Sequence, residues 1–106
     1  MKTVMVRYKT RPECAAENEA LIKGVFDSLA WLQPAGLAYQ AFRLADGVSF
    51  VHLARIDEDA ADGHPLLKLE AFQQFIANIR ARCEEPPVSV ELTPLGQFES
   101  EGVPQT

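Results

Sequence analysis

The sequence predicts an α+β domain of the ferredoxin-like βαββαβ type, a four-stranded antiparallel sheet with two helices on one face. Two long segments carry apolar residues at helical spacing, and strand-like segments of β-branched and aromatic residues flank each of them. The two middle strand-like segments are separated by Asp46-Gly47, a pair that favours a tight turn between antiparallel strands. In this order the elements match the split βαβ pattern.

The first strand and the first helix are expected between residues 3 and 32. Residues 3–9 (TVMVRYK) are mostly β-branched or aromatic, as in a strand. Thr10 and Glu13 have the spacing of a capping box, which predicts a helix over residues 13–32. Its apolar stripe consists of Cys14, Leu21, Ile22, Val25, Leu29 and Leu32. The QPAG sequence that follows is typical of a helix end.

The second half of the chain is expected to hold a hairpin, a helix and a last strand. The hairpin occupies residues 36–57, and residues 69–83 have the apolar spacing of the second helix. Two prolines at 86 and 87 are expected to end that helix. The alternation in residues 88–98 predicts the fourth strand. We expect a single domain over residues 1–99 and a flexible tail at 100–106.

The hairpin turn predicts which side chains share a face of the sheet. A two-residue turn at Asp46-Gly47 pairs Arg43 with Phe50 and Ala41 with His52. One face then carries Tyr39, Ala41, Arg43, Phe50, His52 and Ile56. The other carries Ala38, Gln40, Phe42, Leu44, Val51, Leu53 and Arg55. Because the second set is more aliphatic at its centre, we expect it to pack under the helices.

The first set places three polar side chains together, Tyr39, Arg43 and His52. We expect them to point away from the helices into a cavity, where His52 acts as acid or base and Arg43 holds a substrate anion. A purely structural hydrogen-bonded network is the alternative, since buried polar groups are usually satisfied that way. The further candidates for substrate contact are Tyr8, Phe50, Ile56 and His64.

Composition and charge exclude several classes of partner. The net charge is −5 and the ten basic residues are scattered, which argues against nucleic acid and anionic membranes. No apolar run approaches the roughly 20 residues of a membrane span. Two cysteines and no export signal predict reduced thiols and a cytoplasmic protein. No metal or cofactor motif is present, and the acidic DEDAADG loop lacks the spacing of a calcium loop, so none is expected.

The hairpin strands are apolar on both faces, as in strands that are covered on both sides. Two helices can cover only one face of a four-stranded sheet. A second copy of the chain is the economical cover for the other face, which predicts a two-fold homodimer through the sheet.

The element order, together with VRYKTRPE, AFQQF and VELTPLGQF, resembles the antibiotic biosynthesis monooxygenase type of dimeric α/β barrel over roughly residues 3–98. The resemblance implies a cofactor-independent monooxygenase that acts on an electron-rich aromatic or polyketide-like molecule. Haem-degrading members of the family have an asparagine on the first strand and a tryptophan near the end of the third strand. This chain differs from them, because Val6 and Ile56 stand at those positions. The alternatives are a non-catalytic ligand-binding or accessory module, or another reaction such as isomerisation or decarboxylation in the same cavity.

Overall fold

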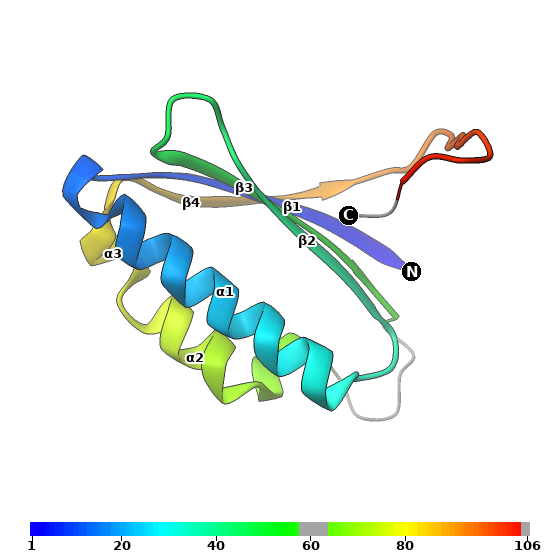
Figure 1. Ribbon diagram of the computed structural model, residues 1–106, viewed down its shortest axis with the longest axis horizontal. Helices are drawn as coiled ribbons and strands as arrows, with labels where there is room; N and C mark the ends of the chain where they lie inside the picture. Colours follow the sequence, from blue (N-terminus) through cyan, green and yellow to red (C-terminus); the bar gives the residue numbers. More distant parts are fainter. Residues whose placement is uncertain (58–63, 105–106) are drawn as a thin grey trace.

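The computed structural model describes residues 1–57 and 64–104. Its strands are β1 (Lys2–Thr10), β2 (Leu37–Arg43), β3 (Ser49–Ile56) and β4 (Cys83–Leu92). They form one antiparallel sheet in the order β2-β3-β1-β4. The helices are α1 (Ala15–Leu32), α2 (Glu70–Ala77) and α3 (Ile79–Arg82), with 3₁₀ turns η1 (Pro12–Cys14) and η2 (Leu66–Lys68). Helices α1 and α2 cover one face (Figure 1), as the ferredoxin-like prediction requires.

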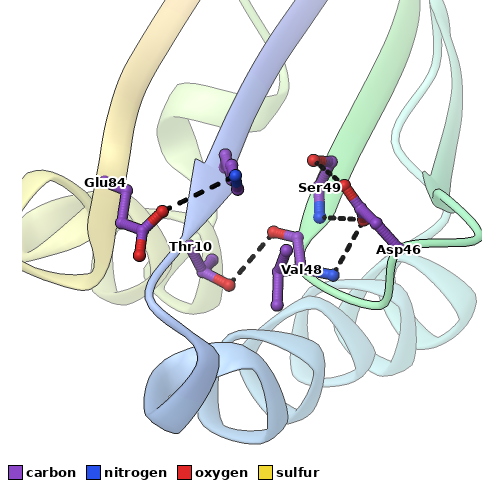
Figure 2. A network of polar contacts seen from close by, with 6 residues as sticks. Thr10, Asp46, Val48, Ser49 and Glu84 are labelled. Carbon is purple, nitrogen blue, oxygen red and sulfur yellow. Dashed lines mark hydrogen bonds and ion pairs between the residues drawn. The ribbon is translucent and has the colours of Figure 1, made fainter.

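The N-terminal end of α1 differs from the predicted capping box. The side chains of the N-cap residues Arg11 and Cys14 make no capping hydrogen bond, and the helix follows directly on η1. The backbone N–H of Thr10 donates to the Val48 carbonyl at 2.8 Å. The Thr10 hydroxyl donates to the same carbonyl at 3.1 Å (Figure 2). Thr10 therefore ties β1 to the hairpin loop. The other end is as expected, because Gln33 adopts a left-handed conformation and donates its N–H to the Leu29 carbonyl.

The second helix is shorter than predicted and the last strand begins earlier. Helix α2 ends at Ala77, and Arg82 donates from Nη2 to the Phe75 carbonyl near that end, at 2.6 Å. Cys83 opens β4 and does not lie on the helix; it is buried and unbonded, as the prediction of free thiols requires. Pro86 and Pro87 lie within β4. They are tolerated there because β4 is an edge strand that pairs only with β1.

The hairpin has the predicted register but a different turn. Arg43 pairs with Phe50 and Ala41 with His52. The strands end at Arg43 and begin again at Ser49, so the connection is longer than two residues. Only Gly47 has a positive φ in this loop, whereas a type I′ turn needs two such residues. The Asp46 carboxylate instead accepts the N–H groups of Val48 and Ser49 and the Ser49 hydroxyl (Figure 2).

The two faces of the hairpin carry the predicted sets of residues, but the face that packs under the helices is the opposite of the one predicted. The side of the sheet that packs under the helices is the one with Tyr39, Phe50 and His52. The more aliphatic set lies on the open face, where no element of the described chain covers it (Figure 1). The reason is aromatic bulk, because Phe72 and Phe75 of α2 pack on Tyr39 and His52 and build the core there.

The open face of the sheet is markedly apolar. Phe42, Val88 and Val90 are 47%, 61% and 40% exposed. Met5 pairs with Leu53 and Val90 at the centre of this face. Beyond β4, residues 93–104 have no regular strand or helix; they first extend past the end of the sheet and then turn back (Figure 1). Of the predicted tail, residues 105–106 lie outside the described part, as does most of the acidic loop, residues 58–63.

Candidate functional site: a pocket between the sheet and α2

A pocket of about 300 Å³ lies between the helix-facing side of the sheet and α2. Its walls are mostly aliphatic and aromatic, and its polar groups come from the two tyrosines, the two histidines and Ser89. The lining residues are Val4, Val6, Tyr8, Tyr39, His52, Ala54, Ile56, His64, Leu66, Leu67, Phe72, Phe75, Ile76, Ile79, Pro87 and Ser89. An apolar cavity with few polar groups is typical of a site for a small organic ligand.

His52 is held between two tyrosines. The Tyr8 hydroxyl lies 2.8 Å from Nε2, and the Tyr39 hydroxyl lies 2.5 Å from Nδ1. The imidazole stacks on Phe75 with ring centroids 5.4 Å apart. His52 is only 5% exposed. Its orientation is fixed by the hydrogen bonds at both ring nitrogens and by the stacking on Phe75.

A chain of hydrogen bonds continues from Tyr8 into the core. Nδ2 of Asn18 donates to the Tyr8 hydroxyl at 2.9 Å, and Nε of Arg82 donates to Oδ1 of Asn18 at 3.2 Å. Asn18 is 0% and Arg82 4% exposed. The Arg82 guanidinium also lies over the Phe75 ring, 5.5 Å from its centroid. Five side chains therefore form one continuous polar chain from Arg82 to Tyr39.

Burial favours the neutral forms of the titratable side chains Tyr8, Tyr39 and His52 in this hydrogen-bonded series. Burial lowers the pKa of His52 from 6.5 to about 4, so the imidazole is neutral at neutral pH. Burial also raises the pKa of Tyr8 and of Tyr39 well above the ordinary value, and the hydroxyls stay protonated. In the described part of the chain no carboxylate lies within ion-pair distance of Arg82. The guanidinium is thus a buried positive charge that favours negative charge developing nearby.

The structure brings most of the predicted site residues together, but on the other face of the sheet. Tyr8, Tyr39, His52, Ile56 and His64 all line the pocket. The prediction that His52 points away from the helices is wrong, because its ring stacks on Phe75 of α2. His64 enters from the segment before η2, and its Nδ1 is buried with no hydrogen-bond partner in the described structure.

Two predicted residues lie outside the pocket. Phe50 is fully buried beside it and stacks on Tyr8, with centroids 5.4 Å apart, so it supports the site without lining it. Arg43 shares the face of His52 but lies at the end of β2, where it is half exposed. There its Nη1 is 3.2 Å from Oε2 of Glu19 on α1. The ion pair explains why this long side chain turns to the helix and not to His52.

Asn18 and Arg82 were not among the predicted site residues. Both could be found from their spacing, because each takes a core-facing helical position. Asn18 falls between Cys14 and Ile22 on the apolar stripe of α1, and Arg82 follows Ile79 by three residues. A polar residue on an apolar stripe signals a buried partner, although the sequence gives no indication of which partner it meets.

The fold is that of the antibiotic biosynthesis monooxygenases. The chain superposes on the crystal structure of an antibiotic biosynthesis monooxygenase with a TM-score of 0.72 and 20% identity, over 91% of this chain and 100% of the other. Rv0793, a protein from Mycobacterium tuberculosis, superposes with a TM-score of 0.71 and 20% identity, over 92% of this chain and 98% of the other. A mutant of SnoaB, a cofactor-independent oxygenase from Streptomyces nogalater, superposes with a TM-score of 0.66 and 20% identity, over 93% of this chain and 97% of the other. The predicted resemblance is therefore confirmed at the level of the fold.

No protein-family model and no curated protein sequence matches the chain. No helix in residues 1–57 and 64–104 is long and apolar enough to cross a membrane. In those same residues no cluster of three or more histidine, cysteine, aspartate or glutamate side chains could hold a metal ion.

Proposed function

We propose that the chain binds a small, largely aromatic molecule in the pocket beside His52 and oxidises it with dioxygen, as a cofactor-independent monooxygenase. The single observation that carries the proposal is the Tyr39–His52–Tyr8 set at the wall of an otherwise apolar cavity. The similarity in fold to a cofactor-independent oxygenase supports the reaction class.

The reaction needs an electron-rich substrate, because the substrate itself supplies the electrons. With anthrone, the ring CH₂ becomes a carbonyl: one oxygen atom of O₂ bonds to that carbon, and the other leaves with the two hydrogens as water. A pKa near 4 makes His52 a weak base at neutral pH, so its role is to orient Tyr39. The Tyr39 hydroxyl then stabilises the oxygen of the substrate as it gains negative charge.

The test is oxygen uptake by the purified protein, treated with a chelator and free of flavin, in the presence of anthrone. We expect one O₂ consumed for each anthraquinone formed, and a rate reduced at least tenfold in Tyr39→Phe. Phe98→Leu, at an exposed position beyond β4, is the matched control and keeps the wild-type rate. A Tyr39→Phe variant as fast as wild type would contradict the assigned role.

A non-catalytic ligand-binding module is the second candidate, and one observation favours it. Both ring nitrogens of His52 already have hydrogen-bond partners, so the histidine has no free position for a substrate. Saturable binding of anthrone without oxygen uptake would select this function over the oxygenase.

We also propose that the chain is a homodimer through the open face of the sheet, and that it is cytoplasmic. The apolar centre around Met5 and Leu53 and the exposure of Phe42, Val88 and Val90 support the dimer. The two free cysteines are in keeping with a reducing compartment.

A further inference from the structure

The hydrogen-bond chain from Arg82 to Tyr39 has a direction, and Arg82 sets it. A guanidinium has only donors, so the atom of Asn18 that faces Nε of Arg82 must be the amide oxygen. The amide nitrogen of Asn18 then faces Tyr8 and donates to its hydroxyl oxygen. Arg82 thereby fixes the first two hydrogen bonds.

The Tyr8 hydroxyl has one hydrogen to give, and His52 is its acceptor. Phe50 and Phe75 pack around the Tyr8 ring and offer no strong acceptor. If Nε2 of His52 carried the hydrogen, the buried Tyr8 hydroxyl would accept twice and leave its own hydrogen unpaired, which is costly. Nε2 is therefore the acceptor, and a neutral His52 carries its hydrogen on Nδ1.

The last hydrogen bond follows from that tautomer. Nδ1–H of His52 donates to the Tyr39 oxygen, so the Tyr39 hydrogen is not used inside the chain. Tyr39 lines the pocket, and its hydroxyl hydrogen is available to a ligand there.

We propose that Arg82 and Asn18 orient a one-way chain of hydrogen bonds that makes Tyr39 a donor to the pocket, so that the site selects a ligand with an acceptor oxygen such as a ketone, quinone or enolate. The inference rests on the proposed binding of a small molecule in this pocket. Asn18, Arg82 and Tyr8 are positioning residues, and Tyr39 is the group that touches the ligand.

The tautomer of His52 tests the direction without any ligand. In ¹⁵N NMR of histidine-labelled protein, with His64→Gln used to assign the signals, we expect hydrogen on Nδ1 of His52. Asn18→Asp is nearly isosteric but can only accept, so it takes the Tyr8 hydrogen. Tyr8 then accepts from Nε2, and the hydrogen of His52 moves to Nε2. Gln74→Glu, the same amide-to-acid change at an exposed position of α2, should leave the tautomer unchanged.

The selection itself is tested with 1-tetralone and tetralin, which have the same two-ring shape and differ in one carbonyl. We expect wild-type protein to bind 1-tetralone roughly two- to tenfold more tightly than tetralin, the effect of one neutral hydrogen bond. The preference should disappear in Tyr39→Phe and in Asn18→Asp, and remain in Gln74→Glu.

The outcomes separate this inference from the proposed function. Hydrogen on Nε2 in the wild-type protein overturns the inference even if Asn18→Asp does not fold. Equal binding of the two probes by wild-type protein overturns the selection and leaves the pocket as a binding site. Failure of both probes and of anthrone to bind contradicts the proposed function, whatever the tautomer.

Discussion

The Tyr8 hydroxyl lies 2.8 Å from Nε2 of His52, and this contact joins the neighbouring strands β1 and β3 beneath α2. Tyr8 also accepts from Asn18 of α1, so one hydroxyl links a helix and two strands. Contacts within the core therefore fix the orientation of the His52 side chain at the pocket. A ligand does not have to induce that orientation.

Replacing Tyr8 by phenylalanine should destabilise the protein more than replacing Tyr39. Tyr8→Phe keeps the ring packed on Phe50 but leaves Asn18 Nδ2 and His52 Nε2 without their partner. We expect a loss of about 1–3 kcal/mol in the free energy of unfolding. Tyr39→Phe removes one partner at the pocket wall, where water can replace it, and should cost less. Urea denaturation at pH 7 measures both, and a larger loss in Tyr39→Phe would count against this reading.

The stability of the protein should depend on pH through His52. The pKa of His52 is 6.5 ordinarily and about 4 in the folded chain, so between these values the unfolded state binds a proton that the folded state does not. The free energy of unfolding should then fall as pH drops from about 6.5 to about 4, by an amount of order 3 kcal/mol, and this contribution is fully present above pH 6.5.

His52→Gln isolates this effect, because glutamine does not titrate. Urea denaturation at several pH values should show a shallower pH dependence for His52→Gln than for wild type over that window. Parallel curves for the two proteins would mean that His52 is not buried in its neutral form.

Apolar periodicity in the sequence predicts the βαββαβ order. The Asp46-Gly47 pair marks the centre of the hairpin and so predicts the register and the grouping of Tyr39 with His52, although the loop is longer than the predicted two-residue turn. The sequence does not predict which face of the sheet the helices cover. That choice depends on how Phe72 and Phe75 fit against Tyr39 and His52, which is a property of packing between distant segments. The ion pair of Arg43 with Glu19 and the contact of Asn18 with Arg82 are equally long-range.

Filling the pocket should abolish ligand binding without disturbing the polar chain. Ala54 is buried at the pocket wall, and its partner across the sheet is Val4, another lining residue. We expect Ala54→Leu to weaken anthrone binding at least tenfold, measured by fluorescence titration, because the larger side chain occupies the ligand volume. Ala16→Leu, at an exposed position of α1, is the matched control and should bind as wild type does. Unchanged binding in Ala54→Leu would place the ligand elsewhere.

A charge at the centre of the open face should prevent the proposed homodimer. We expect wild-type protein to sediment at twice the 11.7 kDa chain mass, and Leu53→Lys to sediment as a folded monomer, because the charge would be buried in the interface. Asp27→Lys, on the exposed side of α1, adds a lysine away from that face and should remain dimeric. A monomeric wild-type protein at micromolar concentration contradicts the prediction.

Methyl NMR during titration with anthrone tests most directly whether the ligand site lies between the sheet and α2. We predict that the methyl signals of Val4, Val6, Ile56, Ile76 and Ile79, which line the pocket, shift and saturate together. The open face carries Val51, Leu53, Val88 and Val90, and their methyl signals should not shift. Shifts confined to the open-face signals, or no shifts at all, would contradict the assignment of the pocket beside His52 as the functional site.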